Sequence, residues 1–435
     1  MTKLQQIKFT SHPAFEKDST LTLFDGLGDV KNIPSFIFLA GENGSGKTSI
    51  LDLVFNSLGK TKKGYLVSVE DSELDAELTL MEDKESVEVK ITIEDGRIKA
   101  NQDTEQFKVI YNKVDVSFKK TKITSVTPTT VDEKENPREE SENLSQVIPQ
   151  LLANVKTQDA TYFDDYFQEH GVIPAGHTRK LDRFTNAFEK MFDGTKTFKT
   201  IKPQDGEIKI IFTDMDDNEV GLDTFSTGEK QIIYRVGSLL KDLGNLDGAL
   251  VLIDEPETSL HPKWQRKYVQ FLTDVFDGLD IQFIIATHSP YILQGLKNSN
   301  SICYKIDRNK KQVEEEVGFY KNMIGGGPSL NLINYKVYDI ADELLHIELF
   351  AALEIKEGGY NELRKKLEAN TGIKKAKSFL ATINFAVFKV GDSVSESLPI
   401  SIRNKIHHAD EIARPDFSES DLRESIENML ATLST

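Results

Sequence analysis

A glycine-rich stretch near the N-terminus has the composition and spacing of a phosphate-binding loop. Residues 41–48 read Gly-Glu-Asn-Gly-Ser-Gly-Lys-Thr; the apolar run 36–40 before them predicts a buried strand, and 50–58 after them a helix. In that setting backbone N–H groups can surround phosphates, and the helix N-terminus adds positive potential. We expect Lys47 to reach the β- and γ-phosphates of ATP and Thr48 to ligate Mg²⁺, whereas a ligand-free strand–helix turn is the weaker alternative. The predicted phosphate-binding residues are Gly41, Asn43, Gly44, Ser45, Gly46, Lys47, Thr48 and Ser49.

Two adjacent carboxylates end another apolar run. Leu250 to Ile253 lead directly into Asp254 and Glu255. A buried strand that ends in two carboxylates suits a site where a metal ion and a water molecule must both be held. We therefore expect Asp254 to hold Mg²⁺, directly or through water, and Glu255 to polarise an attacking water. An acidic pair by itself is more often a solvated turn, but the phosphate-binding loop upstream favours the catalytic interpretation.

Two further segments gain meaning from their order. Ser226-Thr-Gly-Glu-Lys-Gln opens a predicted helix, and by itself it would be an ordinary N-cap with a capping box. An apolar strand pattern ends at Thr287-His288-Ser289, and a lone histidine after a strand is more often structural. All four segments follow one another between residues 41 and 293, which argues against coincidence.

In this order the four segments resemble the ABC/SMC-type ATPases. "FSTGEKQ" resembles their signature motif, a helix N-terminus that closes on the γ-phosphate of ATP bound by the other subunit. The resemblance assigns Ser226, Gly228 and Glu229 to ATP binding, and it makes His288 a γ-phosphate contact that acts in catalysis with Glu255 and Lys47. Residues 259–261 resemble the D-loop, which crosses to the opposite subunit. The glutamine of the family's Q-loop has no counterpart in residues 119–143 and is not assigned.

The resemblance implies a homodimer or a higher homo-oligomer. If the signature serine completes the site of another copy, a monomer is incomplete, and ATP joins two protomers until hydrolysis releases them. "DEPETSLHP" and "ATHSPYIL" resemble the SMC, repair and overcoming-lysogenization-defect group, and stand-alone ATPases of this style occur in bacterial anti-phage defence. We expect a nucleotide-switched sensor or regulator that controls its own or a partner nuclease effector. The alternatives are a DNA-repair or chromosome-structure ATPase and a soluble transporter ATPase subunit.

A short motif near the C-terminus suggests a second activity. Arg403-Asn404 followed by His408 fits Arg-Asn-x-x-x-His, the pattern of the HEPN ribonucleases. In that family the histidine acts as acid or base and the arginine contacts phosphate. The alternative is structural: Arg403 pairs with a carboxylate, and the histidine caps or packs a helix.

The predicted fold class is α/β. We expect an ABC-type ATPase head in residues 1–330, with a mixed sheet and helices, an antiparallel β subdomain in residues 65–118 and an inserted helical segment in about residues 144–200. Residues 119–143 are rich in charge and predict a linker or surface loop. The two helical patterns in 144–193 are short, so a long coiled coil is not expected. Residues 331–435 predict an all-α C-terminal domain, with a boundary near residue 330.

Composition sets the remaining limits. The net charge of −17 argues against a basic surface that coats nucleic acid, although a local basic groove would still allow nucleic acid as a partner. One cysteine, Cys303, excludes an internal disulfide. The N-terminus is polar and no apolar run reaches membrane-spanning length, so we expect a cytoplasmic protein without a membrane partner.

Overall fold

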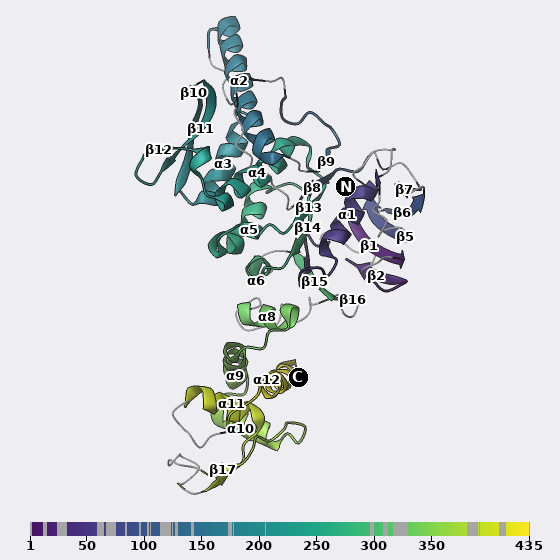
Figure 1. Cartoon of the computed structure of the whole chain (residues 1–435), viewed down its shortest axis with the longest axis vertical. Helices are drawn as coiled ribbons and strands as arrows, with labels where there is room; N and C mark the ends of the chain where they lie inside the picture. Colours follow the sequence, from purple (N-terminus) through teal and green to yellow (C-terminus); the bar gives the residue numbers. More distant parts are fainter. Residues whose placement is uncertain are drawn as a thin grey trace. The chain divides into compact units, whose positions relative to one another are not determined.

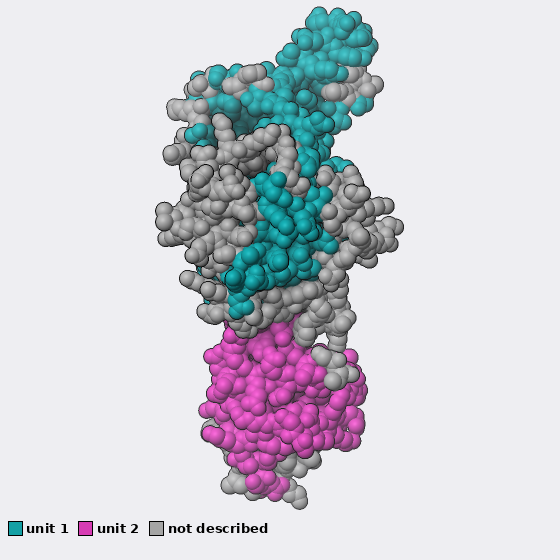
Figure 2. Space-filling model, turned by 90° about the vertical axis from the view of Figure 1, so that its right-hand side faces the viewer, with its two compact units in different colours: residues 1–320 teal, residues 321–435 magenta. Residues whose placement is uncertain are grey.

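The computed structural model divides into two compact units, residues 1–320 and 321–435 (Figures 1 and 2). This division falls before the boundary expected near residue 330. In the described part of the chain, no helix combines the length and the apolar character that crossing a bilayer requires. The structure describes residues 2–11, 15–23, 33–58, 65–66, 75–82, 85–94, 97–101, 104, 106–113, 123, 125–126, 129–140, 143–172, 176, 178–204, 206–295, 300–307, 312–315, 329–380, 390, 392–408 and 415–434.

The first unit is built on a sheet whose described strands have the order β16-β15-β3-β14-β13-β8-β9. Neighbouring strands are parallel except for β15 and β16. The central strands β3 (Phe36–Ala40), β14 (Gln282–Thr287) and β13 (Leu250–Asp254) are buried at every residue, which explains the apolar runs 36–40, 283–286 and 250–253 within them. The outer strands are β8 (Val109–Asn112), β9 (Arg138–Glu140), β15 (Ser301–Asp307) and β16 (Gln312–Glu315).

Helix α1 (Lys47–Leu58) lies between this sheet and a second, antiparallel sheet. It contacts β7, β8, β13 and β14, and Leu51, Val54 and Phe55 join a core cluster with both sheets. The second sheet has the order β2-β1-β5-β6-β7-β4 and confirms the predicted antiparallel subdomain; the expected turn at Asp95-Gly96 lies outside the described residues. Its strands are β1 (Thr2–Ser11), β2 (Ser19–Thr22), β4 (Tyr65–Leu66), β5 (Asp75–Glu82), β6 (Glu85–Glu94) and β7 (Arg97–Ala100).

One strand was assigned to the wrong sheet by its sequence pattern. The alternation of Phe107, Val109 and Tyr111 predicts a further strand of the antiparallel subdomain. In the structure β8 pairs in parallel with β13 and is buried at all four residues. An alternating pattern reports only one buried face, and here Ile110 fills the other face as well.

A helical and β segment lies between β9 and β13. Here α2 (Leu144–His170) is 27 residues long, so the prediction of two short helices is wrong for the first of them. Helix α3 (Asp182–Phe192) and the sheet of β10 (Lys196–Gln204), β11 (Glu207–Asp214) and β12 (Glu219–Gly221) pack through aromatic rings, including Phe188, Phe192 and Phe212. The segment leads into α4 (Thr227–Lys241), and α5 (Pro262–Val275) and α6 (Pro290–Leu293) complete the unit. Short 3₁₀ turns occupy Leu222–Thr224 and Leu243–Asn245.

The second unit is mainly helical, as predicted. A two-strand pair of β17 (Phe379–Leu380) and β18 (Ser393–Val394) interrupts it, which the all-α prediction missed. Its core contains a fully buried polar pair, in which His346 Nε2 lies 2.9 Å from Ser425 Oγ. The helices are α8 (Leu330–Tyr338), α9 (Glu343–Lys356), α10 (Tyr360–Ala369), α11 (Leu398–His407) and α12 (Glu419–Ser434).

Candidate nucleotide site

The loop between β3 and α1 has the conformation that a phosphate-binding loop requires. Gly41 has a φ of +153°, and a Cβ there would lie 2.5 Å from the carbonyl oxygen of Ile306. Gly46 has a φ of +103° directly before the helix starts at Lys47. Because only glycine tolerates these positions, the backbone can wrap closely around a ligand. The sequence prediction of a strand, a loop and a helix is confirmed here.

Lys47 is buried within this loop. Its Nζ donates to the carbonyl oxygens of Gly41 at 2.8 Å and Glu42 at 2.7 Å, and the residue is only 4% exposed. Burial lowers the pKa of Lys47, and the nearby carboxylates of Glu255 and Glu257 act in the opposite direction. The ammonium group is therefore held at the loop by carbonyl oxygens, from which it can turn to a phosphate.

Thr48 and Asp254 face each other across the site. The hydroxyl of Thr48 donates to both carboxylate oxygens of Asp254 at 3.1 Å. Burial raises the pKa of Asp254 to about 6; the Thr48 hydrogen bond lowers it, and the charges of Glu255 and Asp52 raise it further. The raised pKa shows that a nearby cation would stabilise the Asp254 carboxylate. One hydroxyl and one carboxylate also provide oxygen donors, which suit Mg²⁺. Bound there, Mg²⁺ would neutralise phosphate charge, with Thr48 and Asp254 as its protein ligands.

Glu255 turns away from the line of β13. Its φ is +41°, an uncommon value for a residue other than glycine, and its backbone N–H donates to the Ala286 carbonyl at 2.9 Å. The side chain stays 26% exposed, and its Oε1 lies 3.4 Å from His288 Nδ1. Glu255 and His288, which the sequence places far apart, therefore meet at the carboxyl ends of two adjacent strands.

Glu257 is a member of this site that the sequence analysis missed. It is only 5% exposed, and its Oε1 accepts from the Thr287 hydroxyl at 2.8 Å and the His288 backbone N–H at 2.7 Å. The same oxygen lies 3.2 Å from His288 Nδ1. Glu257 therefore fixes both the backbone and the ring of His288. Its spacing of two from Glu255 was visible in the sequence, but its partner 31 residues later was not.

Arg235 of α4 is a second member that the sequence did not reveal. Its guanidinium is 2% exposed and donates to the carbonyl oxygens of Asp254 at 3.0 Å and Glu255 at 3.2 Å, while Nε donates to Gln231 at 2.9 Å. Burial lowers the pKa of Arg235, and Tyr268 and the carboxylates of the site act against this shift. Arg235 thus holds the main chain that carries the Asp254 and Glu255 carboxylates.

The signature segment lies at the N-terminus of α4. Ser226 and Glu229 form a full capping box, in which Glu229 N donates to Ser226 Oγ at 3.3 Å and Ser226 N donates to Glu229 Oε2 at 2.8 Å. Lys196 forms an ion pair with Glu229. Gly228 lies against residues 259–260, because a Cβ there would be 2.4 Å from the Ser259 carbonyl oxygen.

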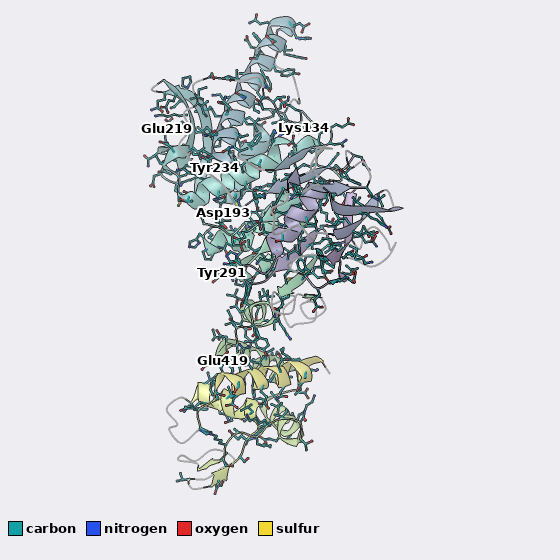
Figure 3. The ribbon with its side chains drawn as sticks, turned by 45° about the vertical axis from the view of Figure 1, so that its right-hand side comes forward. Lys134, Asp193, Glu219, Tyr234, Tyr291 and Glu419 are labelled. Carbon is teal, nitrogen blue, oxygen red and sulfur yellow. The ribbon has the colours of Figure 1, made fainter. Side chains whose placement is uncertain are left out.

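These residues open onto a pocket of about 620 Å³. The end of α3 and the start of α5 contribute to its lining. Asp193, the residue after α3 (Figure 3), pairs with Lys267 of α5. No residue of 41–48 is among the described lining residues, so the signature segment faces a different space from the phosphate-binding loop. The lining consists of Phe192, Thr195, Ser226, Thr227, Gly228, Glu229, Ser259, His261, Lys263 and Trp264.

The C-terminal motif lies on α11 in the second unit. The Arg403 guanidinium lies over the Tyr360 ring at 5.2 Å and the Phe350 ring at 5.8 Å, and it donates to Asn404 Oδ1 at 3.0 Å. Asn404 is buried and donates to Glu396 at 3.3 Å. His408 is exposed and follows the last residue of α11. Arg403 and Asn404 are thus brought together with aromatic and acidic partners.

The strand–loop–helix with its facing Thr48 and Asp254 defines a P-loop ATPase domain of the ABC/SMC type. The chain belongs to the family described as "AAA domain, putative AbiEii toxin, Type IV TA system", whose sequence model matches residues 36–294.

Similar proteins include a retron Vc95 probable ATPase from Vibrio cholerae, 40% identical over 85 residues, which are 18% of this chain and 16% of that protein. Septu protein PtuA from Bacillus thuringiensis is 29% identical over 27% of this chain and 32% of its own length. The chain thus spans less than a third of the length of either relative. The Smc head domain from Pyrococcus furiosus is 10% identical, with a TM-score of 0.42 over 72% of this chain and 96% of that structure, too distant to assign a role to any residue.

Proposed function

We propose that this protein is an ATPase that binds MgATP between two copies of itself and hydrolyses it there. The observation that carries this proposal is the meeting of Thr48, Asp254, Glu255 and His288 at the carboxyl ends of neighbouring parallel strands. In open parallel sheets this edge is where ligands bind.

Each side chain then has a chemical task. Lys47 and His288 contact the β- and γ-phosphate oxygens and offset their charge as the bond to the leaving oxygen breaks. Glu255 accepts a hydrogen bond from a water molecule and orients its oxygen towards the γ-phosphorus; the proton leaves through the carboxylate, and ADP and phosphate are the products. Arg235 and Glu257 do not touch the substrate; they hold Glu255 and His288 in place.

The second copy supplies the signature segment. The separate pocket around Ser226 supports this, since the serine there does not face the phosphate-binding loop of its own chain. A helix N-terminus attracts phosphate, and the pairing of Glu229 with Lys196 offsets a carboxylate that would repel it. ATP bound by one protomer would therefore be enclosed by Ser226 and Gly228 of the other.

We further propose that this nucleotide switch serves anti-phage defence inside the cell. The likeness to a retron ATPase and to Septu protein PtuA supports this role. ATP-driven dimerisation would hold or release a nuclease effector, either a partner protein or the second unit. A partner is the better-supported effector, because the Arg403 side chain already has three partners within its own unit.

The test of the ATP site is Glu255→Gln. This variant should bind ATP and remain dimeric, as measured by light scattering, while turnover falls at least about a hundredfold. Ser226→Ala is its counterpart and should lower turnover without a matching loss of ATP affinity. Normal turnover by Glu255→Gln would refute the role of Glu255, and an equal loss of affinity in Ser226→Ala would argue against a shared site. ATP turnover stimulated by DNA ends would favour the DNA-repair alternative instead.

The ribonuclease hypothesis has its own test. Total tRNA and a structured RNA are incubated with the protein, with and without ATP, beside Arg403→Ala/His408→Ala. Cleavage that the double variant loses would establish a built-in ribonuclease. If no RNA is cut in any nucleotide state, the second unit serves docking or dimerisation and the effector is a separate protein.

A further inference from the structure

The C-terminal half of α2 stands out from the first unit. Its N-terminal half packs through residues such as Leu151, Leu152 and Val155, and Asp159 is the last buried residue of the helix. No residue from 160 to 172 is buried. Figure 1 shows this end reaching beyond β10 and β11. We call residues 160–172 the α2 arm.

The α2 arm carries large aromatic side chains in the places where a solvated helix would carry polar ones. Tyr162 is 43% exposed and Phe167 is 50% exposed. The Tyr162 ring contacts the rings of Phe163 at 5.7 Å and Tyr166 at 6.3 Å, and Tyr166 stacks on His170 at 4.1 Å. The rings of Tyr162, Phe163, Tyr166 and His170 therefore form one continuous surface along about two helical turns. Exposed aromatic surface of this extent marks a contact with another molecule.

Acidic side chains accompany these rings. Asp164, Asp165 and Glu169 are all exposed, and the sequence from 159 to 170 contains no lysine or arginine. The arm's own side chains thus carry negative formal charge, which favours a positively charged partner. Nucleic acid would be repelled, because its phosphates carry the same sign as the arm. A second copy of the arm would bring the same carboxylates face to face.

One contact within the chain displays the chemistry that such a surface favours. The guanidinium of Arg179, on the segment that returns from the arm to α3, lies 5.2 Å from the centre of the Phe163 ring. The next residues of that segment are held by Asp159, which accepts from the backbone N–H groups of Lys180 at 3.1 Å and Leu181 at 2.9 Å. The arm therefore already binds one arginine against an aromatic face.

We propose that the α2 arm docks an arginine-rich segment of a partner protein. Guanidinium groups stack on Tyr162, Tyr166 and Phe167 and pair with the carboxylates of the arm. Arginine is favoured over lysine because its planar group can stack on a ring and bind a carboxylate at the same time.

Binding of fluorescent oligo-arginine and oligo-lysine peptides of equal length to the full-length protein tests the proposal. Fluorescence anisotropy measures the binding, and about 0.15 M salt limits long-range attraction of the peptides by the protein's net negative charge. The arginine peptide should bind about tenfold more tightly than the lysine peptide, and Tyr162→Ala/Phe167→Ala should remove that preference. Both rings are exposed and alanine favours a helix, so the variant should fold, and its ATP turnover should be unchanged.

Two matched charge variants distinguish the effect of the arm's carboxylates on peptide binding from the effect of the protein's net charge. Asp164→Asn/Asp165→Asn should weaken binding of both peptides, whereas Asp216→Asn/Asp217→Asn removes two exposed carboxylates from the β11–β12 turn and should change affinity by less than about twofold. Equal effects of the two pairs, or full arginine binding by Tyr162→Ala/Phe167→Ala, would overturn the proposal. Self-association or single-stranded DNA binding that the aromatic variant abolishes would also overturn it, by identifying a different occupant.

Discussion

Two regions hold charged groups largely out of water: the carboxyl ends of β13 and β14, with Asp254 and Glu257, and helix α11, with Arg403. They balance those charges differently. At the sheet, Asp254 has a hydroxyl as its partner and a raised pKa, and Glu257 Oε2 is buried without a hydrogen-bond partner among the described residues. On α11, Arg403 is covered by two rings and an amide, and Asn404 and Arg364 both approach Glu396.

The difference separates a region that needs a ligand from one that is complete by itself. Buried carboxylates beside a phosphate-binding loop are further stabilised when a cation such as Mg²⁺ arrives with the nucleotide. A cation such as Arg403, whose two rings and amide oxygen are supplied by its own unit, gains little from a further ligand. We therefore expect substitutions at the sheet to change turnover and substitutions on α11 to change stability.

Among residues that do not touch the substrate, the largest effect should follow from Glu257→Gln. The amide keeps the size but weakens the acceptor that holds His288, so kcat should fall about ten- to a hundredfold while the affinity for ATP changes little. Steady-state kinetics and nucleotide titration measure the two quantities. Thr287→Val, which deletes one donor to Glu257, should show a smaller fall that Thr287→Ser restores. A raised KM for ATP with an unchanged kcat would show that Glu257 acts in ATP binding. It would contradict the expectation that substitutions at the sheet change turnover.

A second effect concerns the buried His346 in the second unit. Burial lowers the pKa of His346 to about 3, so the folded unit keeps the ring neutral while an unfolded chain takes up a proton below pH 6.5. Stability is therefore complete above pH 6.5 and declines as the pH falls towards 3, by about 2 kcal/mol at pH 5. Hydrogen exchange of α9 and α12 measures this, since the single tryptophan, Trp264, reports on the first unit. His346→Gln should be less stable at neutral pH and lose this part of the pH dependence; an unchanged pH dependence would contradict the assignment.

The smallest effect is expected for Arg403→Ala. Removing a guanidinium from two rings should cost about 1 kcal/mol in the second unit, visible as faster hydrogen exchange in α11. Arg403→Lys should recover part of the loss, and ATP turnover should change by less than about twofold. If the variant instead lost ribonuclease activity at unchanged stability, Arg403 would be functional and the contrast between the two regions would disappear.

Contiguous motifs made the centre of the site predictable. The loop 41–48 and the acidic end of β13 each lie on one segment whose local pattern fixes the backbone, and parallel strands then bring their ends together. Glu257 and Arg235 were not predictable, because their partners lie on other elements and no local pattern records such a contact. Helix α2 was expected to be short, since its arm lacks the buried periodicity from which helix length is estimated. The assignment of β8 failed for a different reason: Phe107, Val109 and Tyr111 alternate as in a strand with one buried face, and the pattern does not record that Ile110 is buried on the other face.

Helix α4 contacts residues 254–259 at two places. Gly228 touches the Ser259 carbonyl, and about two turns further on Arg235 grips the carbonyl oxygens of Asp254 and Glu255. Because α4 is attached at both points, it cannot tilt without moving residues 254–259. A contact at the exposed N-terminus of α4 would therefore shift the carboxylates of Asp254 and Glu255. In a dimer, the binding of one copy would in this way change the position of these carboxylates in the other copy.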